Sequence, residues 1–329
     1  MLGGADVATT AGALDAVLAT VARRRRLAEA LRAVVEARGY AEVAVPLLQP
    51  AEGGGDWGGA YRVLDQDGSV LALRQDITGP VARLCASGDG GGPRPRRLHY
   101  QATIVRRLPG EGPREILQVG VERIGAAAGE TGGGGDFEML DLVASCLQAA
   151  GAQDFRLAIG NVAYVRERLA QAGVPEGPAL DALQARDYVA LAAAVPPRLF
   201  AELRWRGPLP QALLRCGRHR GPAGCAWRAF LERVAGAAWQ GHVLVEPGLV
   251  PSAGYYTGWV FEALLAGVPW PVGDGGRYDR LLGRWGASEP AVGFALDCDR
   301  LLRALAGPAV ADGARRGWAL LRDSENGRV

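Results

Sequence analysis

The chain has 329 residues, of which 49% are hydrophobic and 22% are charged. This composition is typical of a soluble globular protein, and the length provides for one large or two smaller domains with a sizeable core. The formal net charge is only +2, and the arginines are scattered among acids, which argues against a nucleic-acid-binding surface. The sequence has no apolar run of about 20 residues, so we expect no membrane-spanning helix.

The amino-terminal segment MLGGADVATT lacks the charged-then-apolar order of a signal peptide. The cysteines are odd in number and widely spread, which is typical of reduced thiols: Cys85, Cys146, Cys216, Cys225 and Cys298. We therefore expect a cytoplasmic protein. Cys216 and Cys225 flank His219, but their spacing differs from the short paired motif of structural zinc. No metal site and no cofactor are predicted.

Residues 11–37 predict a long helix, because apolar residues recur at intervals of three and four in LAEALRAVVEARGY. The dense basic run Arg23 to Arg26 is interpreted as the solvated start of its amphipathic part rather than as an RNA contact. Residues 39–50, GYAEVAVPLLQP, alternate like a strand that stops at Pro46 or Pro50. Segment 60–75 predicts a hairpin, with the polar turn QDGS between AYRVLD and VLALR.

DITGPVARLCAS predicts a helix with Asp76 or Thr78 as its N-cap and Pro80 in its first turn. RRLHYQATIVRR and EILQVGVERIG predict two long antiparallel strands joined by the turn LPGEGPR. The run GETGGGGD, residues 129–136, lacks the Lys-Ser/Thr pair of a phosphate loop, so a flexible connection is expected. Asp136 is expected to cap the helix FEMLDLVASCLQAAG, which ends at Gly151.

Further along, DFRLAIGN predicts a strand and AYVRERLAQAGV a helix. Ala, Leu and Arg then dominate with helical spacing. Strand patterns return in GHVLVEPGLV, YYTGWVFEALL and WPVGDGGRYDRLL, and AVGFALDCDRLLRALA predicts a strand running into a helix. The predicted division is a core in two parts, residues 1–164 and 241–312, with a helical insertion at 165–240 and a tail at 313–329.

Four separated segments, LRQDITGPVARL (73–84), ILQVGVE (116–122), YYTGWVFE (255–262) and DGGRYDRLLG (274–283), together resemble the amino-acid pocket of histidyl-tRNA synthetases. The early helix and strand, the two long strands and the final strand and helix resemble the three motifs of class II aminoacyl-tRNA synthetases. The resemblance covers about residues 15–305. It implies an α+β fold in which helices flank an antiparallel sheet, and a dimer formed through the first motif.

The resemblance also implies a site for free histidine. Asp76 and Thr78 match the positions that meet the ammonium group and nearby ligand atoms, and Gln118 and Glu122 match the QxGxE element, in which alternation puts both on one side of a strand. The remaining matches are the imidazole-contacting tyrosines and the glycine-rich strand beside the ring: Tyr255, Tyr256, Gly275, Gly276, Arg277 and Tyr278. Each has a plainer explanation alone, such as a helix cap, core packing or a turn. Their joint order and spacing support the assignment.

Amino-acid activation is not expected. The stretch LVPSAGYY aligns with the synthetase pattern LVRGLDYY, so Pro251 replaces the arginine and Gly254 the aspartate. Proline supplies neither charge nor a backbone donor, and loss of one such donor costs around two to three powers of ten in rate. Candidate remnants of an ATP site are Arg106 or Arg107, Arg114 and Arg300, but Asp297 and Asp299 stand where the third motif usually has glycine and glutamate.

The lost arginine, the retained histidine positions and the lack of room for an anticodon-binding domain match the regulatory subunits of ATP phosphoribosyltransferase. This resemblance implies a non-catalytic protein that assembles with the short catalytic subunit and mediates histidine feedback in the first step of histidine biosynthesis. No tRNA and no membrane partner is expected. Two alternatives stay open: a truncated or divergent histidyl-tRNA synthetase that activates histidine with ATP, and a histidine-binding adaptor for another partner. The stoichiometry, and whether histidine binds the pocket or a subunit interface, are also left open.

Overall fold

A computed structural model describes residues 5–50, 60–87, 95–108, 112–125, 134–216 and 221–306. The helices and strands, in chain order, are α1 (Ala5–Ala37), β1 (Ala41–Glu42), β2 (Leu48–Pro50), β3 (Arg62–Leu64), β4 (Val70–Leu73), α2 (Thr78–Ser87), β5 (Arg96–Leu108), β6 (Gly112–Ile124), α3 (Gly134–Ala149), β7 (Phe155–Asn161), α4 (Val162–Gln171), α5 (Glu176–Gln184), α6 (Tyr188–Ala194), α7 (Pro197–Leu203), β8 (Gly207–Pro208), α8 (Leu209–Cys216), α9 (Pro222–Val234), β9 (Val243–Val245), β10 (Trp259–Leu265), β11 (Gly273–Arg277), β12 (Ala291–Asp297) and α10 (Cys298–Ala306). Two short 3-10 helices span Gln240–His242 and Leu282–Trp285.

The largest sheet has its strands in the order β1-β5-β6-β12-β11-β10-β7-β9-β8. Its centre, from β5 to β7 in this order, is antiparallel, as the sequence predicts. β1 is parallel to β5, and β9 is parallel to β7, so the complete sheet is mixed. A separate sheet, β2-β4-β3, contains the predicted hairpin. The hairpin turn includes Gly68 at φ +84°, a left-handed conformation that favours glycine.

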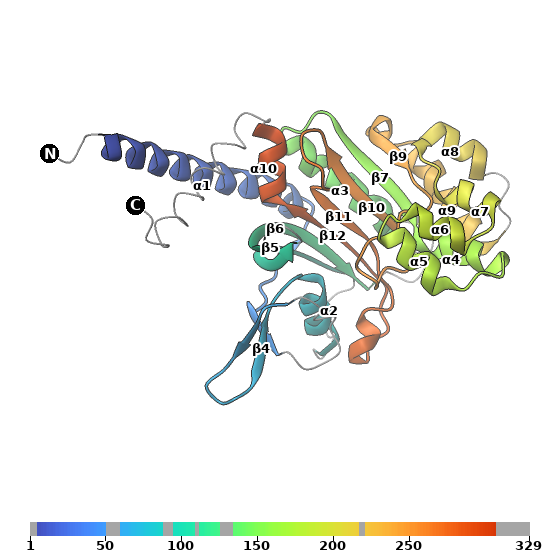
Figure 1. Cartoon of the computed structure of the whole chain (residues 1–329), viewed down its shortest axis with the longest axis horizontal. Coiled ribbons are helices and arrows are strands. Elements are labelled where there is room, and N and C mark those ends of the chain that lie inside the picture. The colour runs from blue at the N-terminus through green and yellow to red at the C-terminus, as the bar shows by residue number, and fades with distance from the viewer. Residues whose placement is uncertain are drawn as a thin grey trace.

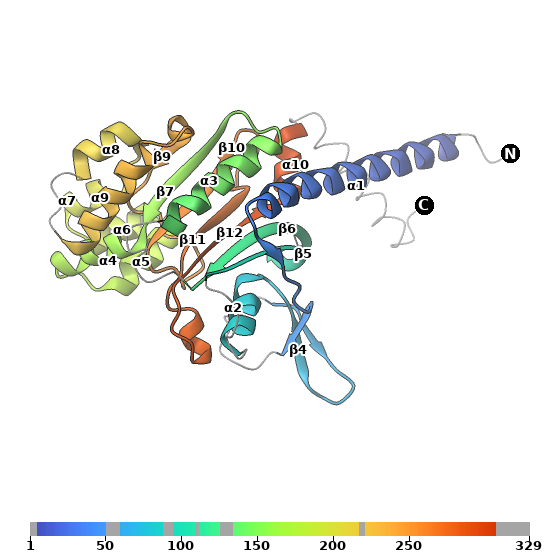
Figure 2. The same cartoon turned by 180° about the vertical axis from the view of Figure 1, so that it is seen from behind.

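The two faces of the large sheet are covered differently. On one face, Val121 of β6 and Phe294 of β12 share a buried cluster with Leu31 of α1 and Leu140 of α3. Figure 2 shows α1 and α3 in front of this face. On the other face, a second buried cluster joins strand residues to α2 and to helices between α4 and α7. Figure 1 shows α4 to α9 gathered at one end of the sheet, and the amino-terminal half of α1 extending away from the body.

Most predicted elements are confirmed, including the helix after the hairpin, the two long strands and the final strand and helix. The cap prediction for α2 is confirmed by Asp76, whose Oδ1 accepts a hydrogen bond from the backbone N–H of Gly79 at 2.7 Å. Helix α3 ends as predicted, with Gly151 following it at φ +85°. Helices α4 to α9 occupy most of the predicted insertion, although β8 lies among them and joins the large sheet. The domain boundaries themselves stay a prediction.

Three predictions are wrong in detail. Residues 39–50 form two short strands in different sheets rather than one strand, because Pro46 between them has no N–H group to continue a ladder. α1 begins at Ala5, before the predicted start at residue 11. Asp136 is not the cap of α3, because that helix already includes Gly134. Its carboxylate instead pairs with Arg277, which ties α3 to β11.

Some predictions fall where the structure describes nothing. The connection 129–133, His219 and the tail 313–329 lie outside the described residues, as do the side chains of Arg107, Arg114 and Cys216. Within the described part, no cluster of three His, Cys, Asp or Glu side chains is placed to hold a metal ion. None of the described helices has both the length and the apolar character needed to cross a membrane.

Candidate functional site

Small residues make a floor on the sheet face opposite α1 and α3. Gly120 of β6 is registered with Ala295 of β12, and Gly293 of β12 with Gly276 of β11. A Cβ atom on Gly120 would clash with the ring of Tyr100, and one on Gly293 with the Glu122 carboxylate. The small residues therefore let these two polar side chains lie directly on the sheet.

One cavity above this floor brings together six of the ten residues predicted to bind histidine: Asp76, Thr78, Gln118, Tyr255, Tyr256 and Tyr278. Arg106, a predicted remnant of the ATP site, also lines it. The residues come from the start of α2, from β5 and β6 and from the loops flanking β10 and β11. The cavity volume is about 30 Å³, which is room for water rather than for an amino acid. A ligand of that size requires lining side chains to move.

Glu122 lies beneath the cavity and is only 1% exposed. The Thr78 hydroxyl donates a hydrogen bond to its Oε1 at 2.6 Å, and the Tyr278 hydroxyl donates to its Oε2. Burial raises the pKa of Glu122 to about 8, against the opposing effect of the two hydroxyl donors. The prediction that Gln118 and Glu122 face the same side of β6 is confirmed, since one lines the cavity and the other binds its wall.

Three tyrosines form the aromatic wall. The Tyr255 ring centroid lies 4.8 Å from that of Tyr256 and 5.7 Å from that of Tyr278. Burial raises the pKa of each hydroxyl well above its ordinary value, and nearby carboxylates, Asp76 and Asp274 among them, raise that of Tyr255 further. All three hydroxyls therefore remain protonated at neutral pH and act as hydrogen-bond donors, that of Tyr278 to Glu122 and that of Tyr256, over 3.4 Å, to Asp274.

Arg277, Gly275 and Gly276 do not line this cavity. The guanidinium of Arg277 pairs with Asp136, with Nε at 2.9 Å from Oδ1, and with Asp279, with Nη1 at 2.9 Å from Oδ1. The two glycines pair with β10 and β12 in the centre of the sheet, where a Cβ atom on Gly275 would clash with the carbonyl of Gly293. The two glycines therefore form part of the sheet beneath the cavity, and Arg277 connects that sheet to α3.

The candidate ATP remnants are largely engaged within the protein. Arg300 Nε lies 3.2 Å from Asp297 Oδ2, and its Nη1 donates to the carbonyl of Pro271 at 2.8 Å. Arg106 Nε donates to the carbonyl of Gln75 at 2.7 Å. Asp299, the second unusual acid, pairs with Arg24 of α1 at 3.1 Å. The positive charge of Arg300 is therefore offset by its own neighbour.

Sequence reasoning missed Asp274 and Tyr100, which also line the cavity. Asp274 immediately precedes the matched GGRY segment. Strand alternation places it on the same face as Gly276, two positions later. That periodicity was the signal that could have identified it. Tyr100 is the cross-strand partner of Gly120, and this pairing brings its ring to the cavity. Nothing in the sequence reveals the pairing before the register of β5 and β6 is known.

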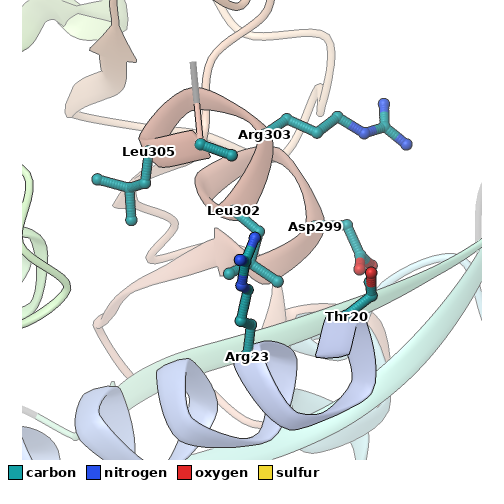
Figure 3. Close-up of a pocket in the computed structure, with 7 residues that line it drawn as sticks. Thr20, Arg23, Asp299, Leu302, Arg303 and Leu305 are labelled. Atoms are coloured by element: carbon teal, nitrogen blue, oxygen red, sulfur yellow. The ribbon is translucent and has the colours of Figure 1, made fainter. Parts of the chain in front are cut away.

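A larger pocket, of about 470 Å³, lies between α1 and α10, away from these residues. Figure 3 shows it lined by Thr20 and Arg23 of α1 and by Asp299, Leu302, Arg303 and Leu305 of α10. It contains none of the predicted histidine-binding residues. We take the smaller cavity as the candidate site because several polar groups from distant segments converge there.

Comparison with known proteins defines the class first. The family model described as histidyl-tRNA synthetase matches residues 12–301. A solved structure of histidyl-tRNA synthetase from Nostoc sp. PCC 7120 shares the fold, with a TM-score of 0.70 at 19% identity over 85% of this chain and 70% of that chain. The fold is thus that of a histidyl-tRNA synthetase-like, class II α+β protein.

The particular family follows from closer relatives. ATP phosphoribosyltransferase regulatory subunits from Symbiobacterium thermophilum and Moorella thermoacetica are 37% and 34% identical, each over 89% of this chain and over 78% and 81% of their own lengths. A Bacillus halodurans structure described as an ATP phosphoribosyltransferase regulatory subunit/histidyl-tRNA synthetase has a TM-score of 0.77 at 28% identity, covering 87% of this chain and 79% of that one. The chain belongs to the family of ATP phosphoribosyltransferase regulatory subunits.

Proposed function

We propose that this protein regulates a separate, short-form catalytic subunit of ATP phosphoribosyltransferase, which joins ATP to phosphoribosyl pyrophosphate. In this proposal the assembly is needed for full activity, and free histidine is the feedback effector in the first step of L-histidine biosynthesis. Family membership supports the regulatory role. The observation that carries the choice of effector is the chemistry of the cavity.

That chemistry suits a free amino acid. Three carboxyl groups surround the space, from Asp76, Glu122 and Asp274, and none has an ion-pair partner among the described residues. Gln118 is only 6% exposed and lines the same space, yet its amide has no hydrogen-bond partner among the residues that the structure describes. The amide is not one of the fully buried polar groups that lack a partner, so it is accessible from the cavity and can bond a ligand there. A ligand with an ammonium group and a carboxylate would satisfy both kinds of group.

The small volume supports a link between binding and conformation. Tyr255 packs between Tyr256 and Tyr278, so its ring is the one that we expect to move when an amino acid enters. A ligand shifts an equilibrium only by its unequal affinity for two states, and a coupling of roughly 1–3 kcal/mol changes affinity about 5- to 150-fold. We assign the conformational difference between the two states to movement of the loop before β10, which carries Tyr255 and Tyr256.

We also propose that the chain forms a dimer through the sheet β2-β4-β3. The face that carries Ala72, which is 0% exposed, is buried only in part, because Leu64 and Val70 on it are 73% and 44% exposed. On the other, outer face, Leu48 and Val63 are 44% and 40% exposed. Cross-strand register places these two side chains on the same face as Leu71 and Leu73. An apolar outer face on a small sheet favours burial by a second copy.

The rival function is activation of histidine with ATP. Neutralisation of Arg300 by Asp297 and the proline at position 251 argue against it. Two measurements on the purified chain test the assignment. Isothermal titration is expected to show histidine binding, and histidine-dependent exchange of pyrophosphate into ATP is expected to be absent. Measurable exchange would establish the synthetase function instead, and absence of histidine binding would remove the cavity as the effector site.

A further inference from the structure

Asp274 is the carboxylate in the cavity with the least satisfied acceptor atoms. Asp76 accepts a hydrogen bond from Gly79 N–H at 2.7 Å, and Glu122 accepts from two hydroxyls. Within the part of the chain that the structure describes, the Asp274 carboxylate receives only a long contact, 3.4 Å from the Tyr256 hydroxyl to Oδ2. Among the described residues, no cationic nitrogen lies within 4.0 Å of it, although Arg106 and Arg300 act on it from farther away.

The head of an amino-acid ligand has better partners elsewhere. Arg106 donates to the carbonyl of Gln75, which places a cation beside Asp76 at the start of α2. This adjacent pair offers a carboxylate for the ligand's ammonium and a guanidinium for its carboxylate. The buried amide of Gln118 on β6 adds a further partner for the same end of the ligand.

Asp274 stands across the floor from that head group. β12 separates β6 from β11, so the two strands are about 9–10 Å apart. The residue of β12 registered with both Asp274 and Gly120 is Ala295, which leaves the space between them free of a large side chain. A ligand with its head at Asp76 and Gln118 would therefore extend its side chain over Ala295 toward Asp274.

We propose that Asp274 determines ligand specificity, by accepting a hydrogen bond from a nitrogen in the side chain of the bound amino acid. This inference rests on the proposed binding of a free amino acid in the cavity and assigns a residue to its selectivity. An aromatic amino acid of similar size without a ring N–H would leave the Asp274 carboxylate desolvated and unpaired. The site would reject it for that reason.

The same carboxylate is unfavourable for the empty protein. Burial raises the pKa of Asp274, so its charged form is disfavoured in the folded state. Replacing it by a neutral isostere should therefore leave thermal stability unchanged or higher at neutral pH while weakening ligand binding. Loss of affinity without loss of stability is the behaviour of a binding residue kept at a cost to the fold.

The test compares two probes, histidine and β-(2-thienyl)alanine, whose ring has no nitrogen. Both are titrated calorimetrically into the full chain and its Asp274→Asn and Asp274→Ala variants. In the wild type, histidine should bind about 10- to 100-fold more tightly than the analogue, the range of a hydrogen bond to a charged group. Both variants should lose at least tenfold in histidine affinity and less than threefold in analogue affinity, with melting temperatures no lower than wild type.

The matched control is Glu262→Gln. Glu262 is registered with Asp274 across β10 and β11 but pairs with Arg186 and does not line the cavity. It should leave the selectivity unchanged. Equal weakening of both probes by Asp274→Asn would mean that Asp274 meets the shared ammonium group, and unchanged affinities would mean that it meets no ligand. Either result overturns this inference alone, whereas a wild type that binds neither probe overturns the proposed function with it.

Discussion

Thr78 and Glu122 are 44 residues apart in the chain, and the Thr78 hydroxyl donates a 2.6 Å hydrogen bond to the Glu122 carboxylate. This bond joins the first turn of α2 to the buried carboxyl-terminal end of β6. It brings together two segments that the sequence could match only as separate motifs. The candidate site depends on this junction, because Asp76 and Gln118 line the cavity on either side of it.

Thr78→Val should test the junction. Valine has nearly the same shape but cannot donate, so one oxygen of a buried carboxyl loses its partner. We expect a loss of about 1–3 kcal/mol in the free energy of unfolding, measured with urea, together with weaker histidine binding. Ser87→Ala, at the exposed end of the same helix, should change stability by less than about 0.5 kcal/mol. Equal stability of Thr78→Val and wild type would contradict this role.

The protein should lose stability as the pH rises through neutrality. The pKa of Glu122 is about 8 in the folded protein, whereas its ordinary value is 4.5. Between these two pH values the carboxyl therefore keeps its proton in the folded protein but loses it in the unfolded chain. Its contribution is fully present below about pH 4.5 and is lost as the pH rises to about 8, with a total of a few kcal/mol. Glu122→Gln should flatten this part of the profile in urea titrations between pH 5 and 8.5. Parallel profiles for the two proteins would show that Glu122 titrates normally.

Arg277 should prove to be a structural residue rather than a ligand-binding one. It and Asp136 are 20% and 13% exposed, and removing one partner of such a pair leaves the other uncompensated. We expect Arg277→Met to cost about 3 kcal/mol in stability and to leave the histidine affinity of the folded protein within threefold. Arg25→Met is the control, because that side chain is 79% exposed and pairs with Glu29 along α1. A tenfold loss of affinity with normal stability would place Arg277 at the ligand, as its motif predicts.

The outer face of the sheet β2-β4-β3 should form the interface between two copies of the chain. Val63→Glu places a charge on the outer face of β3, and sedimentation velocity should show a shift from dimer to monomer, with the melting temperature of the monomer little changed. Val189→Glu introduces the same charge on α6, at a side chain that is 83% exposed, and should leave the dimer intact. A Val63→Glu protein that remains dimeric would exclude this face as the interface.

Local patterns predicted most elements, because alternation, caps and turns are local in sequence. The resemblance to histidyl-tRNA synthetases, rather than any local pattern, implied six of the residues that line the cavity. Three kinds of feature were not local. The division of residues 39–50 between two sheets depends on which strands lie beside them. Asp136 and Arg277, which form an ion pair, are 141 residues apart in the chain. Tyr100 enters the site only through the register of β5 with β6. Asp274 begins the segment DGGRYDRLLG that resembles the synthetases, but the resemblance implies ligand-contacting positions only from Gly275 onward, so the place of Asp274 in the cavity was not predicted.

The most direct test of the account mixes this chain with a short-form catalytic subunit and titrates histidine while product formation from ATP and phosphoribosyl pyrophosphate is followed. The account predicts a gain in activity on mixing and its progressive loss as histidine is added. No gain on mixing, or a gain that histidine leaves unchanged while it binds the chain, would contradict the central claim.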